Sequence, residues 1–158
     1  MAEERVPLVS IVIPVYRGAN YMREAIDSAL GQSWPRCEVM VVNDGSPDGG
    51  ETERIALSYG DRIRYIAKEN GGVSTALNEG IRQMKGEYFS WLSHDDLYLP
   101  DKIAHQMACL QGCDTSKTIV FGDYANFTDE AMVEENVVGK RYTKEELERP
   151  LFAVFHRA

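Results

Sequence analysis

The sequence has few cysteines. There are only three among 158 residues, Cys37, Cys109 and Cys113. An odd count this low does not build a disulfide framework, and no second Cys/His pair stands at metal-ligand spacing beside Cys109 and Cys113. We therefore interpret all three as reduced thiols, which are typical of a cytoplasmic protein.

Long hydrophobic runs are absent. Residues 1–7 are charged and short, without the apolar region of a signal peptide. No run approaches the roughly 20 apolar residues with which a helix crosses a bilayer. We expect no transmembrane segment, although a longer parent protein with peripheral membrane association stays compatible with this pattern.

Positive charge is also scarce. The sequence has 17 Lys and Arg against 25 Asp and Glu, a formal net charge of -8. Because no basic cluster offsets this charge, the composition argues against nucleic acid as a partner. An acidic protein can still bind a phosphorylated ligand, provided that a metal ion or backbone N–H groups neutralise the phosphates locally.

What the sequence does contain is an alternation of strand-like and helix-like segments, which we expect to form a single domain over 1–158. Asn20 and Pro100 predict helix starts, and Gly31 and Gly86 predict helix ends. From about residue 128 the chain becomes rich in Glu and predicts a peripheral tail, either poorly ordered or a hairpin and a helix. Strands are expected at 8–15, 37–42, 63–67, 88–92 and 118–123, and helices at 20–30, 51–59, 73–84 and from 100.

This alternation predicts a doubly wound, mostly parallel α/β sheet with right-handed crossovers. In such sheets the ligand lies outside the carboxyl ends of the strands. The unusual residues of this sequence fall there. Tyr16 follows the first strand, Asp44 the second, Asn70 the third, and residues 94–96 the fourth.

The tetrapeptide Ser93-His94-Asp95-Asp96 offers two adjacent carboxylates at a strand end. Such hard oxygen ligands suit Mg²⁺ or Mn²⁺, which would supply the positive charge that the chain lacks. The alternative is that Asp95 or Asp96 merely caps the helix expected from Pro100. It is not a hydrolase triad, because neighbours in sequence cannot point at one another in a relay.

Two turn-forming segments have both a structural and a functional interpretation. Asp44 and Gly45 can form a simple tight turn, or the Asp44 carboxylate can accept the imide N–H of uracil or thymine beside an unobstructed Gly45. The turn Asn70-Gly71-Gly72 can be a connection that needs positive φ, or it can aim helix N-terminal amides at a phosphate.

Several of these segments form one set between about residues 9 and 106. They are 10–16, 26–32, 42–46, 69–74 with Asn78, 86–88 and 93–100. In order and spacing they resemble the nucleotide-sugar-binding part of an inverting family 2 glycosyltransferase. The resemblance implies a Rossmann-like GT-A fold that ends before the acceptor-binding half.

The resemblance also implies roles for individual residues. Mn²⁺ or Mg²⁺ would be held by Asp95, with Asp96 beside it, and would bridge the diphosphate. The catalytic base would lie beyond Ala158. The nucleobase pocket would be lined by Pro14, Val15 and Tyr16, with Asp44 and Gly45 at the nucleobase. The ribose and phosphate region would be shaped by Asn70, Gly71, Gly72 and Asn78. The donor site would be completed by His94 and Asp95.

Two positions depart from the family's pattern. Ser93 stands where many members have the first Asp of the metal motif, so His94 or a water must replace its contact, or the metal binds more weakly. Asn43 replaces a frequent Asp and removes one charge near the base pocket.

We expect a UDP-sugar as donor, with dTDP- and GDP-sugars as alternatives, and an unknown saccharide, lipid or protein acceptor. The rival interpretations are a non-catalytic nucleotide-sugar-binding module and a sugar nucleotidyltransferase. The latter needs a Gly-rich, basic loop after the first strand, where only Arg17 and Gly18 stand.

Overall fold

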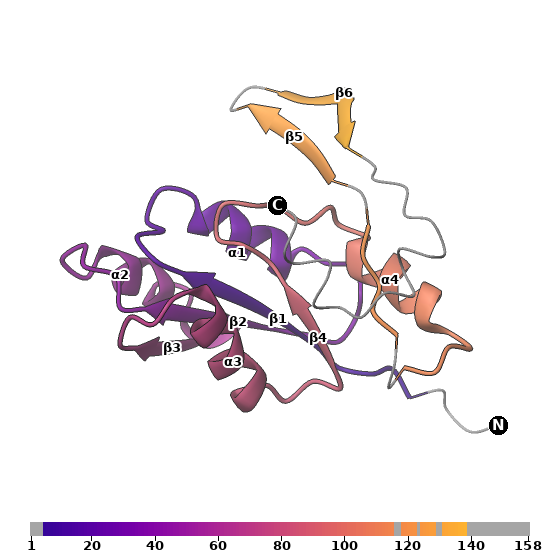
Figure 1. Ribbon diagram of the computed structural model, residues 1–158, viewed down its shortest axis with the longest axis horizontal. Coiled ribbons are helices and arrows are strands. Elements are labelled where there is room, and N and C mark those ends of the chain that lie inside the picture. Colours follow the sequence, from indigo (N-terminus) through magenta and orange to yellow (C-terminus); the bar gives the residue numbers. More distant parts are fainter. Residues whose placement is uncertain (1–4, 116–117, 123, 129–130, 139–158) are drawn as a thin grey trace. The chain divides into compact units, whose positions relative to one another are not determined.

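The computed structural model describes residues 5–115, 118–122, 124–128 and 131–138. The chain divides into two compact units, residues 1–112 and 113–158, and the single domain over 1–158 stays a prediction. The first unit contains β1 (Val9–Val15), α1 (Met22–Leu30), β2 (Cys37–Asp44), α2 (Glu51–Leu57), the 3-10 helix η1 (Gly60–Arg62), β3 (Arg64–Lys68), α3 (Val73–Gln83), β4 (Tyr88–Trp91) and α4 (Lys102–Leu110) (Figure 1).

The four strands form a parallel sheet in the order β3-β2-β1-β4, which confirms the predicted α/β fold. The chain moves from β1 outward to β2 and β3, and then crosses back to place β4 on the other side of β1. The strand order therefore reverses between β1 and β4. In open parallel sheets a ligand site is expected at the carboxyl ends of the strands at this point.

Helices cover both faces of the sheet, and every residue of β1 is buried. Ile11 and Ile13 belong to the larger core, which α1, α2 and α4 cover, whereas Val12 belongs to the smaller core under α3. Burying one such side chain stabilises the fold by about 1.5–3 kcal/mol. A Cβ on Gly80 of α3 would lie 2.4 Å from Val12 Cγ1, so a glycine there lets the helix approach the sheet closely.

Three predicted helix boundaries are wrong in detail. The N-cap of α1 is Tyr21 rather than Asn20, without a side-chain cap, because backbone N–H groups at the helix start reach the Gly18 carbonyl. Asp101 precedes α4, so Pro100 lies just before the helix. Gly86 does not end α3, because the helix stops at Gln83. Gly86 instead lies close to β1, where a Cβ would be 2.5 Å from Ser10 Oγ. Gly31 does follow α1, as predicted.

In the second unit, β5 (Tyr124–Thr128) and β6 (Ala131–Val138) form an antiparallel pair. The strand predicted at 118–123 is wrong in position, because residues 118–122 form no strand and Asp123 lies outside the described residues. Its β-branched and aromatic residues favour a strand, but such a propensity needs a paired neighbour to take effect. Of the tail predicted from about residue 128, the structure describes residues 128 and 131–138, where β6 pairs with β5; the rest lies outside the described residues.

The helices in the described part of the chain are short. The longest is α3, with 11 residues. No helix among the described residues is long and apolar enough to cross a membrane.

Candidate functional site

A hollow of about 300 Å³ opens at the carboxyl ends of the strands, where the strand order reverses. We call it the switch-point pocket. Residues at or just after the ends of all four strands meet there, as the sequence predicted. Its lining consists of Pro14, Val15, Tyr16, Asp44, Asn70, Gly72, Val73, Ala76, Ser93, His94 and Asp95.

The β1 side of the pocket changes abruptly from buried to exposed. Val15 is 1% exposed and Tyr16 is 43% exposed. Arg17 follows with φ at 54°, a left-handed conformation that non-glycine residues rarely adopt. Two contacts hold it: its N–H donates to Ser46 Oγ at 3.0 Å, and its guanidinium lies 5.5 Å from the centre of the Tyr16 ring. Tyr16 thus presents an aromatic ring at the rim.

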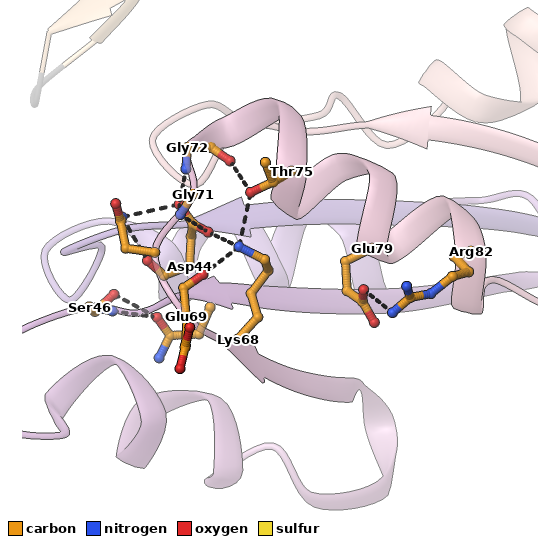
Figure 2. Close-up of polar contacts among 11 residues, drawn as sticks. Asp44, Ser46, Lys68, Glu69, Gly71, Gly72, Thr75, Glu79 and Arg82 are labelled. Carbon is orange, nitrogen blue, oxygen red and sulfur yellow. Dashed lines mark hydrogen bonds and ion pairs between the residues drawn. The ribbon is translucent and has the colours of Figure 1, made fainter.

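Asp44 lies at the floor of the pocket and is 3% exposed. Its Oδ1 accepts hydrogen bonds from Lys68 Nζ at 2.5 Å and from the Gly71 N–H at 3.1 Å. Its Oδ2 accepts from the N–H groups of Gly71 and Gly72, at 3.2 and 2.7 Å, and from Asn70 Nδ2 at 3.2 Å. Figure 2 shows Lys68, Gly71 and Gly72 around the Asp44 carboxylate.

These contacts decide the charge of Asp44. Burial raises the pKa of its carboxyl, but hydrogen bonds from Lys68, Gly72 and Gly71 outweigh burial and hold the pKa below its ordinary value. Asp44 is therefore an anion at the pocket floor. The glycine amides before α3, considered above as phosphate ligands, are occupied by this carboxylate.

The turn after β2 fixes the approach to Asp44. Asn43 Oδ1 accepts from both the N–H and the Oγ of Ser46, at 3.0 and 2.7 Å. Asn43 Nδ2 donates to the Tyr65 hydroxyl at 2.9 Å. Gly45 has φ at 67°, and a Cβ there would lie 2.7 Å from the Asn70 backbone nitrogen. The segment is therefore a tight turn, and Gly45 lets the two loops meet without lining the pocket itself.

The loop after β4 brings His94 and Asp95 to the pocket. The His94 ring packs over Gly18, where a Cβ would lie 2.8 Å from His94 Cδ2. Asp95 lines the pocket, and Asp96 next to it is also exposed but is not part of the lining. Neither acid precedes α4 directly, since Asp101 does, so the capping interpretation is wrong.

The described residues include no cluster of three or more His, Cys, Asp or Glu side chains that would enclose a metal ion. The pocket nevertheless offers Asp95 and His94, with Asp96 adjacent. Mg²⁺ and Mn²⁺ commonly use one or two protein carboxylates and take their other ligands from substrate phosphates and water. The donor set therefore fits a metal that arrives with a diphosphate.

The structure leaves some predicted site residues outside the pocket and adds others. Asn78 is exposed on α3, and Gly71 supports Asp44 without lining the hollow. The residues that sequence reasoning missed are Ala76, which lines the pocket from α3, and Lys68, which donates to the Asp44 carboxylate. No sequence signal marked Lys68, because only the strand register shows that it ends β3 as the partner of Asp44.

Comparison with known proteins identifies the family of the chain. The model of the family described as "Glycosyl transferase family 2" matches residues 10–151. The chain belongs to glycosyltransferase family 2. It is 58% identical over 145 residues to an uncharacterized glycosyltransferase of Rickettsia felis, covering 92% of this chain and 23% of the relative. It is 45% identical over 101 residues to the hyaluronan synthase of Pasteurella multocida, covering 63% of this chain and 10% of that enzyme.

Two solved structures show the same GT-A fold. TarS of S. aureus (residues 1–349) in complex with UDP-GlcNAc matches with a TM-score of 0.54 and 27% identity, over 65% of this chain and 30% of that one. The mannosyltransferase PcManGT of Pyrobaculum calidifontis, in complex with GDP-Man and Mn²⁺, matches with a TM-score of 0.57 and 27% identity, over 70% of this chain and 34% of that one. The chain thus spans less than half the length of these relatives.

Proposed function

We propose that the switch-point pocket binds the nucleotide part of a UDP-sugar through a divalent metal, and that the protein transfers the sugar with inversion. The observation that carries this proposal is the pairing of two features in one pocket. An anionic Asp44 lies at its floor, and the carboxylate of Asp95 lies on the loop after β4. Family membership and the UDP-GlcNAc complex of TarS support it.

We assign the nucleobase to the Asp44 end of the pocket. A carboxylate accepts hydrogen bonds only, so it suits the single imide N–H of uracil or thymine. Guanine presents two N–H groups on the corresponding edge. Five protein contacts already reach the two Asp44 oxygens, which leaves little room for a bidentate base. This favours a UDP- or dTDP-sugar over a GDP-sugar, although PcManGT holds GDP-Man.

We assign the diphosphate to the Asp95 end, with Mn²⁺ or Mg²⁺ held by Asp95, and His94 and Asp96 beside it. When bound, the metal offsets the charge that develops on the departing nucleoside diphosphate. His94 lines the same pocket, and we assign to its ring the ribose or metal contact that the missing first acid would make. Such a contact would compensate for Ser93.

Transfer also needs a carboxylate base to take the proton of the acceptor hydroxyl. In this proposal the two acids that line the pocket already have other roles: Asp44 binds the nucleobase and Asp95 binds the metal. We therefore assign no catalytic base among the described residues. The saccharide, lipid or protein acceptor is likewise left unassigned.

Titration calorimetry of the chain with nucleotides tests this proposal. We expect UDP to bind more tightly than CDP, because cytosine lacks the N3–H that Asp44 accepts, and more tightly than GDP. Equal affinities for UDP and CDP would refute the role of Asp44. Incubation with labelled UDP-sugars and an acceptor panel gives the second readout, and rapid transfer would show that a base lies within these residues.

A further inference from the structure

The end of α1 contacts the loop that carries Asp95. We propose that Ser28 and Gln32 position this loop for binding of the metal-bound diphosphate, an inference that rests on the function proposed above for Asp95. Ser28, Gln32 and Ser33 together are called the α1 clasp. None of the three lines the switch-point pocket, so they act on it only through the loop.

Gln32 uses both ends of its side-chain amide. Its Nε2 donates to the Leu99 carbonyl at 2.9 Å and to the Ser28 carbonyl at 3.1 Å. Its Oε1 accepts from the Ile103 N–H at 3.0 Å. That N–H belongs to the first turn of α4, where backbone donors have no partner within the helix. One side chain therefore joins the end of the loop to the start of α4.

Ser28 and Ser33 add two further contacts to the same stretch. Ser28 Oγ accepts from the Tyr98 N–H at 3.1 Å and donates to the Ala25 carbonyl at 2.8 Å. The Ser33 N–H donates to the Pro100 carbonyl at 2.8 Å. Four backbone groups between Tyr98 and Ile103 are thus bound by the α1 clasp.

Other contacts also hold this loop: the His94 ring packs against Gly18, and the Tyr98 hydroxyl bonds with the Trp91 carbonyl and with Ser90 Oγ. Before it, the Leu92 N–H donates to the Val12 carbonyl at 3.1 Å, which continues the sheet. Within it, the Asp96 N–H donates to the Ser93 carbonyl at 3.2 Å, and both Asp95 and Asp96 are exposed. The exposed Asp95 and Asp96 thus lie between two held ends, the sheet on one side and residues 98–103 on the other, where the α1 clasp binds four backbone groups.

The chemistry of position 32 is specific. An amide both donates and accepts, as these contacts require, whereas a carboxylate accepts only. Gln32→Glu would place an anion against the carbonyls of Leu99 and Ser28 and release the loop end. Ser28→Ala would leave the Tyr98 N–H without its acceptor. Both variants keep the shape of the side chain nearly unchanged.

The test uses calorimetry on the 158-residue chain with uridine, UDP plus Mn²⁺, and UDP plus EDTA. We expect Gln32→Glu and Ser28→Ala to reduce the Mn²⁺-dependent gain in UDP affinity about tenfold, as is usual when support around metal ligands is lost. Uridine affinity should stay within about twofold, because the base pocket is not touched. Gln83→Glu, at the end of α3, and Ser58→Ala, whose Oγ donates to the Ile55 carbonyl at 2.6 Å, are the matched controls.

The outcomes separate the two claims. If the parent chain binds UDP equally well with Mn²⁺ and with EDTA, the proposed function is overturned, and this inference with it. A parent with a clear Mn²⁺-dependent gain that both clasp variants retain overturns the inference alone. An equal loss of uridine and UDP affinity in both variants also overturns it, because the clasp would then only stabilise the fold. If Gln32→Glu does not fold, Ser28→Ala decides alone.

Discussion

Lys68 Nζ lies 2.5 Å from Asp44 Oδ1, and the two residues are register partners on the neighbouring parallel strands β2 and β3. Lys68 Nζ also donates to the Glu69 carbonyl at 2.5 Å and to Thr75 Oγ1 at 2.9 Å. The ion pair therefore connects the pocket floor to the first turn of α3 (Figure 2). It explains how a nearly buried carboxylate stays ionised at the end of a strand.

This pair should contribute measurably to stability. Removing one partner leaves a buried charge without its counter-ion, so we expect Lys68→Met to lower the free energy of unfolding by about 1–3 kcal/mol. In urea denaturation, the double variant with Asp44→Asn should lose less than the sum of the single variants. The exposed pair Arg54–Glu51, at 3.6 Å, is the control and should show almost no coupling. Additive losses for Lys68 and Asp44 would contradict the pairing.

Asp44→Asn should also change base preference. The Asn amide can donate as well as accept, so it can bond to the N3 acceptor of cytosine. We expect the preference for UDP over CDP to narrow by about tenfold, which corresponds to one hydrogen bond of about 1.4 kcal/mol. Calorimetry with both nucleotides measures it. An unchanged ratio would mean that Asp44 holds the glycine loop without contacting the base.

Gly18 should tolerate no side chain. A Cβ there would lie 2.5 Å from Val15 Cγ1 and 2.8 Å from His94 Cδ2. We expect Gly18→Ala to cost about 1–3 kcal/mol of stability through overpacking and to weaken UDP binding, because Val15 and His94 both line the pocket. Gly122→Ala, with nothing within 4 Å of its Cβ, is the control. Thermal unfolding and UDP titration check both effects, and a neutral Gly18→Ala would contradict the packing.

Lys102 gives the chain a pH-dependent stability. Burial lowers the pKa of its amine to about 8, and the amine lies 3.5 Å from the centre of the Tyr98 ring. Between pH 8 and the ordinary value of 10.5 the folded chain has released this proton while the unfolded chain retains it. The unfolding free energy should therefore rise with pH across this window.

Lys102→Met should flatten that rise, and the exposed Lys85→Met should not. Burial raises the pKa of Tyr98 to about 12 from 10.0, which lowers stability above pH 10, so urea denaturation is compared between pH 8 and 10. If the unfolding free energy rises equally steeply with pH in the parent and in Lys102→Met, the amine is not a buried group that releases its proton in this window.

Much of this architecture could be predicted from the sequence, because buried parallel strands leave continuous apolar runs such as that of β1. The pocket could also be located, since strand ends in such a sheet must meet. What the sequence did not indicate is which polar groups are already satisfied. The glycine amides before α3 bind Asp44, and the partner of Asp44 is Lys68, which only the strand register reveals. The strand expected near residue 118 failed for a similar reason, since a ladder needs a neighbour that propensity does not specify.

The most direct test of the central claim is the affinity of the chain for UDP with Mn²⁺ and with EDTA, in the parent, Asp95→Asn and Asp96→Asn. We expect Mn²⁺ to strengthen UDP binding but not uridine binding, since uridine has no diphosphate. Asp95→Asn should abolish this gain, Asp96→Asn should reduce it less, and Asp61→Asn, an exposed acid of η1 before β3, should leave it intact. UDP affinity that is the same with Mn²⁺ and EDTA, or a gain that survives Asp95→Asn, would contradict the account.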